Sequence, residues 1–228
     1  FGNKGAQLFG MHVAANGTFL WSGSFATAVN PSNVRVVARA DGGVSTLHWD
    51  AMTIAPEVST FSSTGSRLWH VASGLALSSD QSFSDLKFAA GQDGDVVAAV
   101  LYYESGIPYA QQTRLNGNGA LLFTGLPQPQ PGAPLRHSFS LAMYPDDTSM
   151  ITAGSFQHLT RKGATLTAPA TSAVTLATTT DANALLGPDG SVYTIVTNAS
   201  SKLVGVSAYS NTGALRWHSS IPSSWNNG

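Results

Sequence analysis

The stretch Phe61-Ser62-Ser63-Thr64-Gly65-Ser66-Arg67-Leu68-Trp69 decides the fold, because altered copies of it recur along the whole chain. Each copy centres on a glycine that has an apolar residue four positions before it. An aromatic residue follows four positions after the glycine in four of the five copies, and Thr167 takes that place in the other. These repeat positions are Gly17, Gly65, Gly119, Gly163, Gly213, Trp21, Trp69, Phe123 and Trp217. Glycine spacings of 48, 54, 44 and 50 residues indicate a repeat architecture.

The segment 34–73 shows what one repeat contains. Apolar and β-branched runs over 34–40, 44–49, 54–61 and 67–71 predict four strands. Asp-Gly and Thr-Gly dipeptides lie between them, and both are typical of hairpin turns. Four-stranded antiparallel meanders at this spacing are the blades of a β-propeller. Because no long stretch keeps a helical period, we expect an all-β fold of this kind.

Further blades are predicted over about 85–125, 138–168 and 180–219, after the first at 34–73. Residues 1–23 have room only for the two outer strands of a blade, which makes about four and a half to five blades in all. The chain is therefore expected to be one propeller domain or a piece of a larger one. The missing strands would come from another segment or another subunit. We interpret the repeated aromatic residues as packing between blades and the repeated glycines as hairpin formers.

Composition excludes several functions. The chain has 228 residues, 10% of them charged, a formal net charge of −1 and no cysteine. A net charge this close to zero does not favour binding to nucleic acid or to an anionic membrane surface. No apolar stretch is long enough for membrane insertion. Without cysteine there is no disulfide, thiolate zinc site or cysteine nucleophile. The cysteine-free, Ser- and Thr-rich composition predicts an extracytoplasmic bacterial protein that is secreted, periplasmic or at the cell surface.

The segment 206–217 resembles the outer strands of pyrroloquinoline-quinone-type propeller repeats, because it contains Thr-Gly followed by Trp217. Residues 59–69 and 11–21 are looser versions, and Gly-Ser-Phe at 23–25 and 154–156 resembles bacterial cell-surface propeller repeats. The resemblance implies a quinoprotein-like propeller scaffold. No cluster of Glu, Asn and Asp matches the calcium and quinone ligands of the enzymes in that family, so no cofactor is expected. Calcium is the weaker alternative.

Candidate site residues lie where loops gather. In a four-stranded blade the tight turns lie at one end, and the remaining loops lie together at the other end, where binding residues concentrate. The candidates at the loop end are Asp50, Tyr102, Tyr103, Glu104, His70 and His218. Asp50 and Glu104 occupy comparable positions in successive repeats. They could act as an acid/base pair or as calcium ligands, or they could be solvated loop carboxylates. His70 and His218 both follow the repeated Trp, but no ligand spacing supports a metal site there.

These observations favour a non-catalytic propeller that binds a protein or a carbohydrate through its loop-rich end, as an adhesin, lectin-like module or scaffold. The Pro-rich segment 125–134 is either a stiff connection between blades or a protruding arm for a partner. One alternative function is a quinoprotein-like or hydrolytic enzyme that uses Asp50 and Glu104. The other is a structural subunit of a surface layer or filament.

Overall fold

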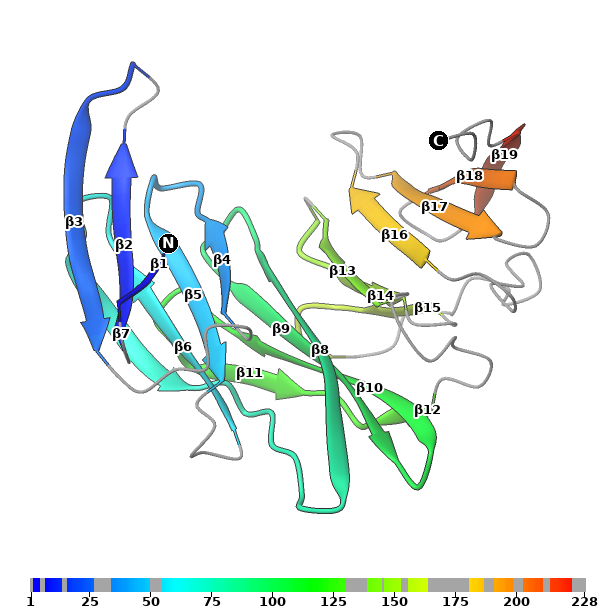
Figure 1. Ribbon diagram of the computed structural model, residues 1–228, viewed down its shortest axis with the longest axis horizontal. Coiled ribbons are helices and arrows are strands. Elements are labelled where there is room, and N and C mark those ends of the chain that lie inside the picture. The colour runs from blue at the N-terminus through cyan, green and yellow to red at the C-terminus, as the bar shows by residue number, and fades with distance from the viewer. Residues whose placement is uncertain are drawn as a thin grey trace. The chain divides into compact units, whose positions relative to one another are not determined.

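The computed structural model consists of β-strands and turns (Figure 1). It describes residues 2–4, 7–13, 16–26, 34–49, 55–129, 139–144, 146–152, 156–163, 181–186, 191–198, 203–210 and 214–222. Over these ranges there is no helix, and every strand pair with a recorded register is antiparallel. The all-β expectation is thus confirmed. No helix within the same ranges is long and apolar enough to span a membrane.

The described strands form five sheets, each made of strands that follow one another along the chain. The first sheet contains β1 (Gly2–Lys4), β2 (Gln7–Val13) and β3 (Phe19–Ala26). The second contains β4 (Arg35–Ala38), β5 (Val44–Trp49), β6 (Pro56–Phe61) and β7 (Arg67–Ala72). The third contains β8 (Gln81–Ala90), β9 (Val96–Glu104), β10 (Ile107–Leu115), β11 (Leu121–Thr124) and β12 (Gln128–Pro129).

The remaining two sheets lie nearer the C-terminus of the sequence. The fourth sheet contains β13 (Ser140–Met143), β14 (Ser149–Thr152) and β15 (Phe156–Leu159). The fifth contains β16 (Asp181–Leu186), β17 (Val192–Asn198), β18 (Leu203–Tyr209) and β19 (Leu215–Pro222). Successive strands therefore pair as meanders, as the repeat pattern predicted.

The structure differs from the sequence expectation at three points. The first sheet has three strands instead of two, because Gly2–Lys4 pairs with Gln7–Phe9. Strand β8 begins at Gln81, before the predicted start of its blade at about 85. Part of the Pro-rich segment is a strand, because Gln128 and Pro129 pair with β10 as an extension of the outer edge.

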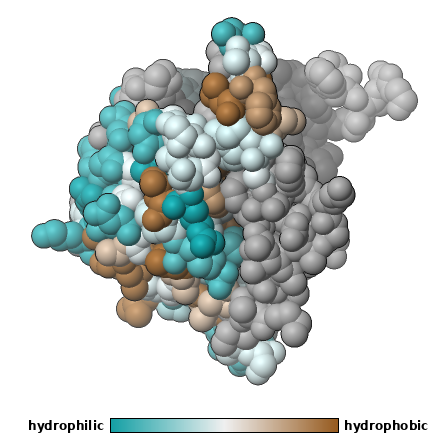
Figure 2. Space-filling view, turned by 90° about the vertical axis from the view of Figure 1, so that its left-hand side faces the viewer, coloured by the Kyte–Doolittle hydropathy of each residue, from teal (hydrophilic) through white to brown (hydrophobic). Residues whose placement is uncertain are grey.

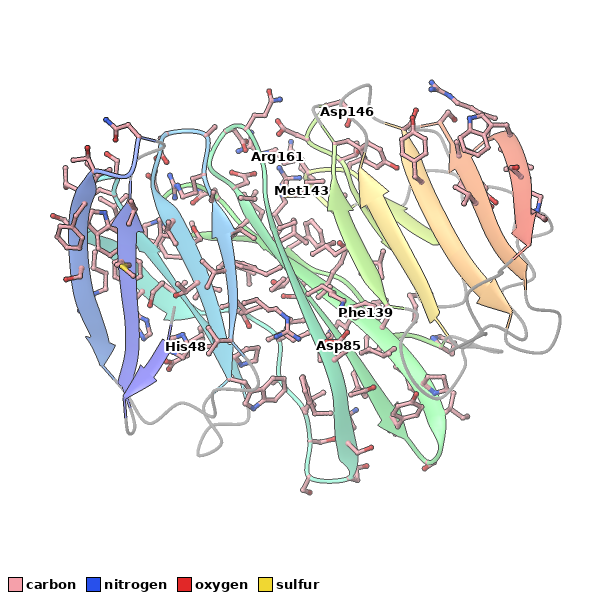
Figure 3. All side chains as sticks on the ribbon, turned by 45° about the horizontal axis from the view of Figure 1, so that its top comes forward. His48, Asp85, Phe139, Met143, Asp146 and Arg161 are labelled. Carbon is pink, nitrogen blue, oxygen red and sulfur yellow. The ribbon has the colours of Figure 1, made fainter. Side chains whose placement is uncertain are left out.

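The chain divides into two compact units. One comprises Phe1–Ser79, Phe88–Ala98 and Thr113–Thr124, and the other comprises Asp80–Lys87, Ala99–Gln112 and Gly125–Gly228. In the first unit the buried apolar side chains include Leu47, Val58 and Phe61. In the second, Phe139 (Figure 3) packs with Ala99, Leu101, Ala110 and Ile151. Each unit therefore has an apolar core of its own.

The repeated glycines lie in one kind of hairpin turn. In the β6–β7 turn, Gly65 donates its N–H to the Ser62 carbonyl, Ser62 donates its N–H to the Ser66 carbonyl, and Gly65 has a φ of 85°. These bonds define a type I turn followed by a left-handed residue, which favours glycine. The positive φ recurs at Gly17, Gly119 and Gly163, whereas Gly213 lies outside the described residues.

A β-bulge lies at the start of β3, β7, β11 and β19, the strands that follow a repeated glycine in the sequence. In the β6–β7 pair, Phe61 lies opposite Arg67 and Thr60 lies opposite Trp69, so Leu68 is the extra residue. The β2–β3, β10–β11 and β18–β19 pairs have the same register shift. The extra residue is again the one three positions after the glycine: Leu20, Leu122 and Arg216. A bulge changes the direction of the next side chain. The repeat therefore fixes where its aromatic residue points.

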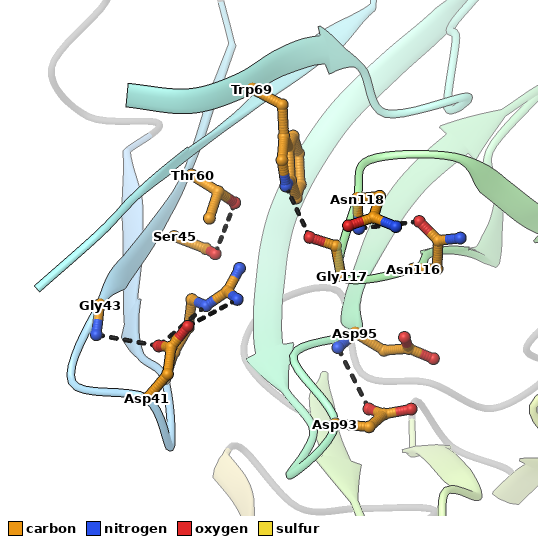
Figure 4. Close-up of polar contacts among 11 residues, drawn as sticks. Asp41, Gly43, Ser45, Thr60, Trp69, Asp93, Asp95, Asn116, Gly117 and Asn118 are labelled. Atoms are coloured by element: carbon orange, nitrogen blue, oxygen red, sulfur yellow. Dashed lines mark hydrogen bonds and ion pairs between the residues drawn. The ribbon is translucent and has the colours of Figure 1, made fainter. Parts of the chain in front are cut away.

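The first two aromatic residues each pack on the turn of the following repeat. Trp69 donates its indole N–H to the Gly117 carbonyl over 2.8 Å (Figure 4), and a Cβ on Gly119 would lie only 2.9 Å from its ring. Trp21 likewise donates to the Ser63 carbonyl over 3.0 Å, and a Cβ on Gly65 would lie 2.6 Å from its ring. Glycine is thus required at these turns by close approach as well as by backbone conformation.

Candidate functional site

The structure assigns the candidate residues to three separate places. Tyr102, Tyr103 and Glu104 form the end of β9, His70 is on β7, and His218 is on β19. Asp50 lies outside the described residues, so its predicted pairing with Glu104 stays a prediction.

The end of the β9–β10 hairpin presents aromatic and polar side chains together. Ser105 and Gly106 both have positive φ, at 51° and 79°, as a tight two-residue hairpin requires. Glu104, just before this turn, accepts a 3.1 Å hydrogen bond from the side-chain amide of Gln81 on β8. The carboxylate is therefore held in one orientation by its neighbour on the sheet.

Two tyrosines stack next to this carboxylate. The rings of Tyr102 and Tyr109 are 5.7 Å apart and 15° from parallel. Burial raises the pKa of the Tyr102 hydroxyl, and the negative charges of Glu104 and of ionised Tyr109 raise it further. Tyr102 is buried, whereas Tyr109 is only half-buried. Among the described residues, none accepts or donates a hydrogen bond at the buried Tyr103 hydroxyl. We call Gln81, Glu104 and Tyr109 the tyrosine–glutamate end; Tyr103, directly before Glu104 on β9, belongs to the other face of the sheet.

The Pro-rich segment borders this end. Pro129 lies opposite Tyr109 in the sheet, and Gln128 lies opposite Ala110. Gln111 anchors the start of the segment by donating its side-chain amide to the Gly125 carbonyl over 2.9 Å. Residues 130–134 lie outside the described residues. The described part of the segment is thus an edge strand beside the tyrosine–glutamate end.

A second polar cluster surrounds His70. Glu57 Oε2 lies 3.1 Å from His48 Nε2 and 3.3 Å from His70 Nε2, and the two imidazole rings stack 5.9 Å apart. On its other side His70 shares a 2.8 Å hydrogen bond between Nδ1 and Ser59 Oγ. His48, which Figure 3 labels, Glu57 and Ser59 were not singled out from the sequence. Their alternation on paired strands was the signal that could have found them.

The Ser59–His70 pair has the elements of a hydrolytic site but also recurs as a structural contact. Ser207 Oγ pairs with His218 Nδ1 over 2.9 Å at the matching position of β18 and β19. In the third sheet, Thr113 and Thr124 hydroxyls form a 3.2 Å hydrogen bond at that same position. Ser59 is also buried. These pairs therefore tie the two outer strands of a sheet together.

The separate serine partners also bear on the metal hypothesis. His70 and His218 each bind a serine on their own sheet. Within the described ranges, no group of three His, Cys, Asp or Glu residues is placed to hold a metal ion. Other charges are paired locally: Arg114 and Asp95 form a fully buried ion pair at 2.8 Å, Lys87 and Asp85 one at 2.8 Å, and Arg39 and Asp41 one at 2.9 Å. The tyrosine–glutamate end thus differs from these sites in having a carboxylate whose recorded partner is neutral.

Comparison with known proteins shows which solved structures the fold resembles. No protein-family model matches the chain, and no curated protein matches it in sequence. A quinoprotein alcohol dehydrogenase-like protein from Bacteroides thetaiotaomicron is similar over 96% of this chain and 52% of its own, with a TM-score of 0.50 and 9% identity. An exo-β-1,3-galactanase from Phanerochaete chrysosporium, solved with galactose, is similar over 94% of this chain and 54% of its own, with a TM-score of 0.48 and 13% identity.

The chain thus spans about half the length of these two solved propellers. At 9% identity, the likeness to the quinoprotein-like structure shows the fold alone, which is a propeller-like succession of antiparallel sheets.

Proposed function

We propose that the protein is a non-catalytic, extracytoplasmic binding propeller and that the tyrosine–glutamate end holds a neutral, hydroxyl-rich ligand such as a glycan. The observation that carries the proposal is the hydrogen bond from Gln81 to Glu104 beside the half-buried ring of Tyr109. A fixed carboxylate and amide offer acceptors and donors to ligand hydroxyl groups, and a tyrosine ring offers an apolar face. Protein loops carry the same groups and are the other candidate ligand.

The state of the other ionisable groups supports binding over catalysis. A general acid or base needs a perturbed environment and free access to the substrate. Asp95 is fully buried against Arg114, and Ser59, which contacts His70, is buried as well. The alternative enzyme function depends on Asp50 acting together with Glu104. It predicts activity that is lost in Asp50→Asn.

The proposed architecture is a propeller of about four and a half to five blades. Three described sheets have four or more strands, and two have three. Strands from another segment or subunit would complete the shorter ones. The proposed extracytoplasmic location rests on the absence of cysteine and on a surface chemistry dominated by Ser and Thr.

Glycan-array screening of the intact chain, followed by calorimetric titration of the best ligand, tests the proposed function. We expect Glu104→Gln and Tyr109→Ala to weaken binding by about tenfold or more, because the first replaces the charged acceptor with a neutral amide and the second removes the ring. Gln81→Ala should weaken it less, since the carboxylate remains. The matched control is Gln92→Ala, which removes the same side chain from an exposed position beyond the opposite end of β8.

Two results would refute the proposed site. One is wild-type chain that binds no glycan on the array and no protein from an envelope extract. The other is Glu104→Gln and Tyr109→Ala variants that bind as tightly as the wild type and Gln92→Ala.

A further inference from the structure

The outer edge of the third sheet is made of two strands that are not continuous with each other. Strand β11 pairs with the end of β10, where Thr124 lies opposite Thr113, and β12 pairs nearer its start, where Gln128 lies opposite Ala110. Between these two pairs, residues 111–112 of β10 face the longer stretch 125–127. The outer edge therefore has one extra residue, which interrupts the ladder of backbone hydrogen bonds as a β-bulge does.

Residues 126–129, which we call the proline strap, are attached to β10 through a short ladder. Gly125 donates its backbone N–H to the Gln112 carbonyl over 2.8 Å, so Gln112 directs its backbone polar groups toward the outer edge. Ala110, two residues earlier on β10, directs its own N–H and C=O the same way, toward Gln128. Strand β12 has two residues, whereas β11 has four. A paired segment this short opens locally at a small cost in free energy.

The strap carries an apolar ring to the tyrosine–glutamate end. Pro129 lies directly opposite Tyr109, and directly opposite residues point to the same face with Cβ atoms about 4.5–5.5 Å apart. Tyr102, on the strand at the other side of β10, stacks on Tyr109 with 5.7 Å between ring centroids. The three rings thus follow one another across neighbouring strands. When the strap is paired, Pro129 widens the apolar surface that Tyr109 offers.

Proline suits this place in the sheet. Opposite residues in an antiparallel pair alternate between those that exchange ladder hydrogen bonds and those that do not. Because Ala110 and Gln128 are of the first kind, Tyr109 and Pro129 are of the second. The Pro129 nitrogen therefore points away from β10, and its missing N–H costs no ladder bond.

We propose that the proline strap is a movable part of the ligand site, and that a sugar ring stacked on both Tyr109 and Pro129 holds it against β10. A pyranose ring has a face of C–H groups and can span two strands about 4.8 Å apart. In the free protein the strap pairs with β10 and separates from it. Binding favours the paired state, because only that state offers both rings. The proposal rests on the proposed function, since it places the ligand on Tyr109.

Amide hydrogen exchange of the intact chain, measured by NMR and corrected for intrinsic rates, tests the movement. The Ala110 N–H faces the strap, whereas the Arg114 N–H faces Phe123 on β11. Without ligand we expect exchange at Ala110 to be about tenfold or more faster than at Arg114. The glycan selected on the array should slow exchange at Ala110 by about tenfold or more and leave Arg114 unchanged.

Three variants separate the strap from its ring. Gln128→Pro removes the backbone N–H that faces Ala110, so the ligand should no longer slow exchange at Ala110 and should bind about two- to tenfold more weakly. Pro129→Ala keeps the ladder and removes the ring, so it should weaken binding by a similar factor without changing exchange in the free chain. Gln128→Ala is the control, because it retains the N–H and changes a side chain on the face opposite to Tyr109. It should match the wild type in both measurements.

Two results would overturn the proposal. In the first, Ala110 is as well protected as Arg114 in the free chain, which would make the strap a fixed strand. In the second, the glycan binds without slowing exchange at Ala110, or binds Gln128→Pro and Pro129→Ala as tightly as Gln128→Ala. A chain that binds no glycan would refute the proposed function and with it the ligand's part in this proposal. The exchange rates of the free chain would then decide the movement alone.

Discussion

Gly119→Ala is the sharpest test of the packing between repeats. Its Cβ would lie 2.9 Å from the Trp69 ring, at a backbone φ of 83°. The left-handed conformation costs a non-glycine residue about 1–2 kcal/mol. Displacing the ring in a packed contact costs about 1–3 kcal/mol, and loss of the indole hydrogen bond to Gly117 costs about 0.5–1.5 kcal/mol. The free energy of unfolding should therefore fall by about 3–6 kcal/mol.

Gly106→Ala is the matched control. Gly106 has a similar φ of 79°, but no heavy atom lies within 4 Å of the added Cβ. Only the conformational cost applies, so the free energy of unfolding should fall by about 1–2 kcal/mol. Urea denaturation followed by circular dichroism measures both. Equal destabilisation by the two variants would refute the packing explanation, because the strain they share would then account for the whole effect.

Three further predictions concern buried polar groups. Asp95→Asn should lower the free energy of unfolding, measured by urea denaturation, by about 3–5 kcal/mol, because it leaves the Arg114 guanidinium buried without its counter-charge. A loss below about 1 kcal/mol would contradict this. Because the pKa of Tyr102 is raised, the folded chain keeps the hydroxyl proton at a pH where the unfolded chain loses it, so stability should decline as the pH rises above about 10. The decline should be less steep in Tyr102→Phe. Identical pH profiles of stability for the two proteins would be inconsistent with the burial of Tyr102. Ser59→Ala should cost about 1 kcal/mol through the lost contact with His70 and leave ligand affinity unchanged, whereas loss of a measured activity would indicate a catalytic serine.

The strands and turns were predictable because their signals are local. The predicted runs 44–49, 54–61 and 67–71 match β5, β6 and β7 to within two residues, since alternating or β-branched residues end at glycine-containing turns. Strand β8 was predicted too short because its first residues, Gln81 to Asp85, are mostly polar. Their pairing with the long strand β9 decides their conformation.

The candidate site was harder to predict because it depends on contacts across strands. Tyr102, Tyr103 and Glu104 were found from their place before a turn, but Gln81 was not, since its contact with Glu104 requires the register of β8 against β9. The cluster around His70 was missed for the same reason. His48 lies opposite Glu57, and Ser59 lies opposite His70, only after the second sheet has formed.

The central claim is that Trp21 and Trp69 each dock on the glycine turn of the next repeat, whereas Trp217 is 46% exposed (Figure 2 shows one face of the molecule by hydropathy). Hydrogen exchange at the indole N–H groups of a dilute, monomeric sample tests this most directly, with each signal assigned by a Trp→Phe variant. We predict slow exchange at Trp21 and Trp69, whose indoles donate to Ser63 and Gly117, and fast exchange at Trp217. Exchange at Trp21 and Trp69 as fast as at Trp217 would contradict the account.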